Sequence, residues 1–269
     1  MPTTTTEFGP PTRKLVDAAY DRARLFPGAR VLEIGCGTGK LTAMLAARGL
    51  RVDAVDPGPA LLETARRRVG DGNVHFHLGR FEDIGLPDES FAAAFSATAF
   101  HWVDPAVGWS KVAAVLAPRG VLALLQTGLP ALVREFDRAV WRSVLPDEEA
   151  WPATDPFHVW SEADARRDDV SALWSWLARH NLENPKAADL FDDVRVLTVP
   201  VPLQYSAESY LALMSTASTY LRLRKDRRAA LDRGVHKIFA AAGGTDHWVD
   251  YATLVTARQR TEQPGPHLE

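Results

Sequence analysis

Three glycines at alternate positions, Gly35, Gly37 and Gly39, follow the strand-like stretch Arg30–Ile34 and precede a segment rich in small residues. Strand, glycine loop and helix in this order are typical of a ligand cradle. Glycine lets the backbone approach a ligand closely, and the first turn of the following helix presents free N–H groups. The loop therefore predicts a ligand site at the end of the first strand.

The sequence of this glycine loop does not fit two familiar nucleotide-binding motifs. A phosphate-binding P-loop needs glycine five positions before Gly39 and Ser or Thr after Lys40, but Ile34 and Leu41 occupy those places. A dinucleotide fingerprint, G-x-G-x-x-G, needs glycine where Lys40 stands. The remaining pattern is G-x-G-x-G, which disfavours NAD as the ligand.

The segment Glu33–Gly39 (EIGCGTG) resembles the first motif of the class I S-adenosylmethionine-dependent methyltransferases, an acidic residue and an apolar residue before G-x-G-x-G. The likeness is closest to the branch of methyltransferase type 11 and trans-aconitate methyltransferase, covers roughly residues 31–126, and returns weakly at Thr216–Leu223. Further matches follow in order at Asp56, Gly79–Phe91 (GRFEDIGLPDESF), Ser96–Pro105 (SATAFHWVDP) and Leu116–Leu124 (LAPRGVLAL).

The resemblance implies S-adenosylmethionine as cofactor, S-adenosylhomocysteine as product and no metal. Asp56, at the end of the second strand, is expected to accept both ribose hydroxyls, and Phe81 to cover the adenine. Because Arg80 replaces the usual acid, the adenine amino group is left to Glu82, Asp83 or a backbone carbonyl. The implied cofactor-binding residues are Glu33, Gly35, Cys36, Gly37, Gly39, Asp56, Pro57, Phe81, Glu82, Ser96 and Ala97.

His101 is the candidate catalytic residue, since relatives place this segment between cofactor and acceptor and histidine can accept a proton near neutral pH. The alternative is that His101 and Trp102 only pack the floor of the site. The acceptor stays open: Arg134, Arg138 and Arg142 would suit an acidic molecule, and tryptophans an aromatic one. Five of the eight tryptophans lie between residues 130 and 189: Trp141, Trp151, Trp160, Trp174 and Trp176.

The elements that must position these residues alternate strand and helix, which predicts an α/β fold: a Rossmann-like, mostly parallel seven-stranded sheet with helices on both faces and an antiparallel last strand. Pro200 and Pro202 require an edge position for the strand that contains them. A turn is expected at Pro118–Gly120. The expected strands are Arg30–Ile34, Arg51–Val55, Val74–Leu78, Phe91–Ala97, Gly120–Leu125, Val194–Tyr205 and Trp248–Ala257.

The domain prediction has four parts. Residues 1–126 form the first half of the cofactor-binding core, and residues 127–192 a helical cap inserted after strand five. Residues 193–260 complete the core with further helical segments, and 261–269 are a tail.

A formal charge of -3 argues against nucleic acid or anionic lipid as partner, and one cysteine, Cys36, excludes an internal disulfide. Without a signal or membrane segment we expect a cytoplasmic monomer or homodimer acting on a small molecule. The predicted function is methyl transfer from S-adenosylmethionine to oxygen, nitrogen or carbon. The alternatives are a non-methylating cyclase or rearrangement catalyst on the same fold, and a ligand-binding or regulatory module.

Overall fold

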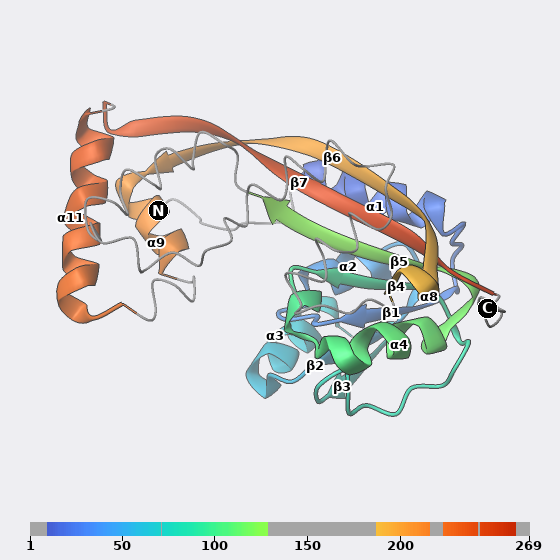
Figure 1. Cartoon of the computed structure of the whole chain (residues 1–269). Helices are drawn as coiled ribbons and strands as arrows, with labels where there is room; N and C mark the ends of the chain where they lie inside the picture. The colour runs from blue at the N-terminus through green and yellow to red at the C-terminus, as the bar shows by residue number, and fades with distance from the viewer. Residues whose placement is uncertain (1–9, 71, 129–186, 216–222, 242, 262–269) are drawn as a thin grey trace, which may run out of the picture. The chain divides into compact units, whose positions relative to one another are not determined.

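The computed structural model describes residues 10–70, 72–128, 187–215, 223–241 and 243–261 (Figure 1). Their strands form one sheet in the order β3-β2-β1-β4-β5-β7-β6. The strands are β1 (Arg30–Ile34), β2 (Arg51–Asp56), β3 (Val74–Leu78), β4 (Phe91–Ala97), β5 (Leu116–Gly128), β6 (Phe191–Ser206) and β7 (Thr245–Gln259). The helices are α1 (Pro10–Arg22), α2 (Lys40–Ala46), α3 (Pro59–Val69), the 3-10 turn η1 (Phe100–Trp102), α4 (Pro105–Val115), α8 (Ala187–Leu190), α9 (Ala207–Met214) and α11 (Lys225–Ala241).

The strand order reverses between β1 and β4. From β1 the chain runs outward through β2 to β3, and then returns to the other side of β1 as β4 and β5, all in parallel. Right-handed crossovers in opposite directions put α2 and α3 on one face of the sheet and α4 on the other. The carboxyl ends of β1 and β4 therefore flank the point of reversal, where open α/β sheets bind ligands.

The second half of the sheet confirms two expectations from the sequence. In Figure 1, β7 runs against β5 and β6, as predicted for the last strand. β6, which carries Pro200 and Pro202, is the outermost strand beyond β7, where a missing N–H costs no ladder hydrogen bond. The predicted α/β class with a mostly parallel, seven-stranded sheet is confirmed for the described residues.

Strand β5 begins earlier than predicted. It starts at Leu116, directly after α4, and the turn expected at Pro118–Gly120 is an irregularity within the strand. Phe91 pairs with Leu116 whereas Ala93 pairs with Val121, so the extra residues of β5 bulge out of the ladder. Arg119 has a φ of +63°, which gives this bulge its sharp bend. The Pro-Arg-Gly signal was correct for a bend but wrong for a strand boundary.

The chain divides into two compact units, residues 1–127, 159–199 and 252–269, and residues 128–158 and 200–251. The described part of the second unit holds α9 and α11, which pack through buried Tyr210, Leu231 and Phe239. The predicted cap at 127–192 falls almost wholly outside the described residues, and the four-part division stays a prediction. No described helix is long and apolar enough to cross a membrane.

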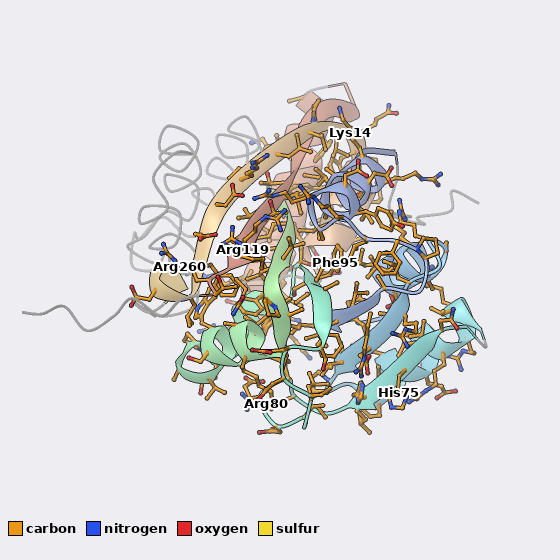
Figure 2. All side chains as sticks on the ribbon, turned by 90° about the vertical axis from the view of Figure 1, so that its right-hand side faces the viewer. Lys14, His75, Arg80, Phe95, Arg119 and Arg260 are labelled. Carbon is orange, nitrogen blue, oxygen red and sulfur yellow. The ribbon has the colours of Figure 1, made fainter. Side chains whose placement is uncertain are left out.

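One hydrophobic cluster of the first unit lies between the sheet and α4. Trp109 of α4 is fully buried, and its ring meets Phe100 edge-on at 4.8 Å and Phe191 at 6.3 Å between centroids. Phe95 of β4, labelled in Figure 2, is also fully buried within the sheet. This packing fixes α4 and η1, and with them the loop that follows β4.

We predict that Trp109→Ala lowers the free energy of unfolding by about 3–5 kcal/mol, because it leaves a large cavity among rings that cannot close over it. The matched control is Trp102→Ala, whose side chain is 75% exposed and should cost less than about 1 kcal/mol. Urea unfolding followed by circular dichroism measures both. Equal losses in the two variants would contradict this description of the core.

Candidate functional site

The loop after β1 turns by three glycines in the left-handed region, with φ of 73° at Gly35, 53° at Gly37 and 77° at Gly39. Side chains are excluded at two of them for a second reason. A Cβ on Gly35 would lie 2.3 Å from the Cβ of Ala99, and one on Gly39 would lie 2.9 Å from the backbone of Ala65. A Cβ on Gly37 would have no neighbour within 4 Å, so open space faces the middle of the loop.

Asp56, the last residue of β2, ties two loops together. Its Oδ2 accepts the Gly37 N–H at 2.8 Å, and its Oδ1 accepts the Gly58 N–H at 2.8 Å. The side chain is buried, with 5% exposed. Each carboxylate oxygen has a second lone pair, so Asp56 can accept a ligand hydroxyl while it holds the loops. The sequence predicted the ligand contact but not this structural role.

Glu33 lies beneath the glycine loop and is 1% exposed. Its Oε2 has no hydrogen-bond partner among the described residues. Burial raises the pKa of Glu33 from 4.5 to about 8, and the nearby Asp56 carboxylate adds to the rise. A buried carboxyl oxygen without a donor is costly, and a cationic or N–H-bearing ligand group beside it would satisfy it.

Three other predicted site residues, Ser96, Ala97 and Cys36, are buried or half-buried at the ends of β4 and β1. The Ser96 hydroxyl donates to the Ile34 carbonyl at 2.8 Å, which joins the end of β4 to the end of β1. Ala97, the next residue, is half-buried at the end of β4. Cys36 is buried, and burial raises the pKa of its thiol well above the ordinary range, so it is a packed thiol rather than a nucleophile.

In the loop after β3, the Glu82 carboxylate that was predicted near the adenine has partners within the protein. The Glu82 Oε1 accepts the Arg80 guanidinium at 2.8 Å and the Asp104 N–H at 2.8 Å. Burial acts to raise the pKa of Glu82, but these donors outweigh it and hold the pKa below its usual value. This carboxylate therefore braces two loops, while Asp83 is exposed. Arg80 is labelled on this loop in Figure 2.

Lys111 of α4 is a site residue that the sequence analysis missed. Its Nζ donates to the carbonyls of Glu82 at 2.8 Å and Ile84 at 2.6 Å, and it lies 5.3 Å from the centre of the Phe81 ring. Phe81 itself is 3% exposed and belongs to the core. Lys111 thus fixes the loop on which an adenine contact is predicted.

Two further residues that the sequence analysis missed shape the cradle. The Arg68 Nε, from the last turn of α3, donates to the Thr38 carbonyl in the glycine loop at 3.0 Å. Thr98, just after β4, has a φ of +51°, which is strained for a β-branched residue and is seen mostly near functional sites. Thr98 lies within the Ser96–Pro105 motif, but residue types do not report its backbone angle, and no motif marks Arg68, whose partner lies 30 residues away in the sequence.

Two predicted residues contribute little to the described geometry. Pro57 is exposed at the start of the loop after Asp56. His101 lies in η1, directly after the site, but its side chain falls outside the described part of the structure. Its catalytic role stays a prediction.

The assembled site fits the methionine end and the ribose of S-adenosylmethionine. The glycine loop leaves open space at Gly37, and beside it lie the orphaned oxygen of Glu33 and the carboxylate of Asp56. An ammonium group can pair with the first acid, and ribose hydroxyls can donate to the second. Among the described residues no group of acids, histidines and cysteine could hold a metal ion.

Comparison with known protein families finds a match over the region that contains this site. Residues 32–124 match the family described as "Methyltransferase domain". An uncharacterized methyltransferase of Mycobacterium bovis is 39% identical over 154 residues, which cover 52% of this chain and 63% of that protein. The malonyl-[acyl-carrier protein] O-methyltransferase of Serratia marcescens is 34% identical over 119 residues, which cover 44% of this chain and 45% of the relative. The chain thus spans less than two thirds of these relatives.

A solved structure shares the fold over nearly the whole chain. A candidate type II methyltransferase from Anaeromyxobacter dehalogenans superposes with a TM-score of 0.61 at 22% identity. The match covers 92% of this chain and 95% of that one. At this identity the likeness shows the architecture alone.

The buried Glu33 predicts an unusual pH dependence of stability in the ligand-free protein. The folded state holds the proton up to a pKa of about 8, whereas the carboxyl has an ordinary value of 4.5 when exposed. Between these values folding takes up a proton, so stability falls as pH rises, by about 1.4 kcal/mol per pH unit. Glu33→Gln removes that contribution.

We therefore expect the wild type to lose about 2 kcal/mol more than Glu33→Gln between pH 6 and 7.5. Urea titrations of ligand-free protein at both values measure this. Glu63→Gln, on the exposed face of α3, is the control and should follow the wild type. Parallel pH curves for wild type and Glu33→Gln would show that Glu33 ionises normally.

Proposed function

The chain contains a domain of the class I S-adenosylmethionine-dependent methyltransferase family, and on that premise we propose that it transfers the methyl group of S-adenosylmethionine to a small-molecule acceptor. The observation that carries the proposal is the pair of buried acids at one glycine loop. Glu33 offers an oxygen without a donor, and Asp56 reaches the loop N–H of Gly37. Glu33 lies on β1, which flanks the reversal point of the sheet, and Asp56 ends the neighbouring strand β2.

In this proposal S-adenosylmethionine supplies an activated methyl group on a good leaving group. The residues of the chain therefore mainly bind, orient and exclude water. Glu33 pairs with the ammonium group, Asp56 accepts the ribose hydroxyls, and the loop held by Lys111 contacts the adenine. The acceptor approaches from the side of η1, where Trp102 is exposed.

The acceptor atom is oxygen, nitrogen or carbon. The Serratia marcescens relative is named for O-methylation of a malonyl group on a carrier protein, but it shares only part of its length with this chain. We propose a freely diffusing small molecule, because the formal charge of -3 offers no general attraction to an acidic carrier protein or to nucleic acid.

We predict that Asp56→Ala weakens S-adenosylhomocysteine binding by about 2 kcal/mol, or roughly thirtyfold. The variant loses the acceptor for the ribose and also the bonds that hold the N–H groups of Gly37 and Gly58. Glu63→Ala, which removes an exposed acid of α3 outside the predicted site, serves as control and should bind within about twofold of the wild type. Isothermal titration calorimetry measures both variants, and an unchanged affinity in Asp56→Ala would point to another acid.

Methyl transfer itself is tested by incubating the protein with S-adenosylmethionine labelled in its methyl group and a small-molecule extract of the cells in which the protein naturally occurs. The proposal expects labelled product whose mass exceeds that of an unlabelled precursor by one methylene. A product of unchanged formula would favour the alternative of a cyclase or rearrangement catalyst. Cofactor binding without any product across extracts would favour a binding module.

For the same reaction we propose His101 as the general base that removes the acceptor proton. His101→Gln should then lower kcat by about 10²- to 10⁴-fold and leave cofactor affinity unchanged. Turnover by the variant close to wild type from pH 6 to 9 would assign His101 to packing, and proximity alone would account for the rate.

A further inference from the structure

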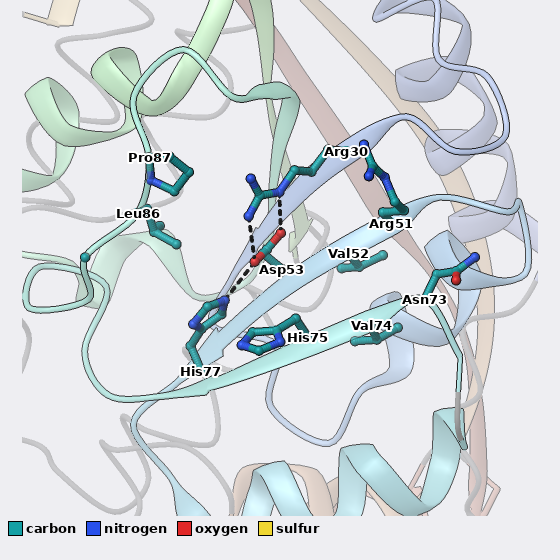
Figure 3. A pocket seen from close by; sticks show the side chains of 11 residues that line it. Arg30, Arg51, Val52, Asp53, Asn73, Val74, His75, His77, Leu86 and Pro87 are labelled. Carbon is teal, nitrogen blue, oxygen red and sulfur yellow. Dashed lines mark hydrogen bonds and ion pairs between the residues drawn. The ribbon is translucent and has the colours of Figure 1, made fainter.

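A second hollow lies at the opposite end of the strands from the cofactor site. Its volume is about 540 Å³, within the range of about 300–1,000 Å³ of small-molecule pockets. Arg30 and Arg51 open β1 and β2, and Asn73 directly precedes β3, so the hollow sits over the amino-terminal parts of β1 and β2 and extends along β3 to His77. The residues after Gly79 pass over this part of the sheet as a loop rather than a helix, and Gly85, Leu86 and Pro87 form its wall (Figure 3).

The strand register brings the polar side chains of the hollow together. Arg30 pairs with Arg51, and Asp53 pairs with His75, so these residues form adjacent rows across β1, β2 and β3. Side chains two apart on a strand share a face, which adds His77 to the same face as His75. Figure 3 shows Arg30 and His77 converging on Asp53 in the middle of the hollow.

Among the described residues that line the hollow, Asp53 is the one acid, and its carboxylate is hydrogen-bonded by two other lining residues. The Arg30 Nε donates to its Oδ2 at 2.8 Å, the Arg30 Nη2 donates to its Oδ1 at 3.2 Å, and the His77 Nε2 donates to Oδ1 at 2.8 Å. Burial acts to raise the pKa of Asp53, but these hydrogen bonds outweigh it and leave the pKa below its usual value. Asp53 therefore stays ionised and orients Arg30 and His77.

The other polar side chains add donors without a further acid. Arg51 is exposed and uses its Nε on the Gly28 carbonyl at 2.9 Å, which leaves both terminal nitrogens of the guanidinium for a ligand. His75 is exposed, and its ring lies 4.5 Å from that of His77. With the Asn73 amide, the lining carries two guanidinium groups, two imidazoles and one amide against a single carboxylate.

We propose that this hollow binds a phosphate group, either free or as the monoester of a small organic molecule. A dianionic phosphate matches the surplus of guanidinium and imidazole donors, because charge-assisted hydrogen bonds to guanidinium are strong and directional. The volume exceeds what one phosphate fills, and Leu86 and Pro87 offer an apolar wall for the organic part of a monoester. The site shares no residue with the predicted cofactor site.

The test is a calorimetric titration of the full chain with inorganic phosphate and, separately, with glucose 6-phosphate, at constant ionic strength set by potassium chloride. Saturable binding of either is expected, and tighter binding of the ester would identify an organic phosphate as the ligand. Arg51→Gln and His75→Gln should each weaken binding by about tenfold, since the first removes a guanidinium donor and the second an imidazole donor. Arg30 and Asp53 are left unchanged because they form a part-buried ion pair that orients the lining.

The matched controls are Arg67→Gln on α3 and His236→Gln on α11, exposed residues that do not line the hollow. They should bind both ligands within about twofold of the wild type. Proton and carbon NMR of the histidine rings shows where the ligand binds. Phosphate should shift the resonances of His75 and His77 but not those of His236. Absence of saturable binding at millimolar phosphate, or equal losses in the controls, would overturn the proposal.

Discussion

The cofactor cradle depends on the carboxylate of Asp56, whose two oxygens accept N–H groups from two separate loops. A glycine loop with three residues in the left-handed region is conformationally costly, since glycine loses more backbone entropy on ordering than other residues. The hydrogen bond from the Gly37 N–H to Asp56 offsets part of that cost and ties the glycine loop to the end of β2. One side chain thus shapes the cradle and is available to its ligand.

In the rest of the site, too, polar side chains hold loops and strand ends in place through hydrogen bonds to backbone groups. Ser96 joins β4 to β1, Glu82 joins the loop after β3 to the start of α4, and Lys111 holds that loop from α4. These bonds connect the regions predicted to contact the cofactor with η1, on the acceptor side. Glu33 differs, since its Oε2 lacks a hydrogen-bond partner, as does the buried hydroxyl of Thr42. A buried group left without a partner in an otherwise satisfied site marks the place where a ligand completes the structure.

The sequence predicted the fold well because each strand carries a local signal. β1, β3 and β4 have the predicted bounds, and the prolines of β6 correctly required an edge. The bulge at Arg119 was read as a turn, because residue types report a bend and not whether pairing resumes beyond it. Long-range polar contacts left no such signal. Lys111 and the ring of donors around Asp53 are assembled by residues far apart in the chain, so only the folded structure reveals them.

The central claim is that the glycine loop, Glu33 and Asp56 form a site for S-adenosylmethionine and not for a nicotinamide dinucleotide. Calorimetric titration of the wild-type chain with S-adenosylhomocysteine and with NAD tests it most directly. We expect saturable, one-to-one binding of S-adenosylhomocysteine and no measurable heat of binding from NAD. Saturable binding of NAD, with none of the adenosyl ligand, would contradict it.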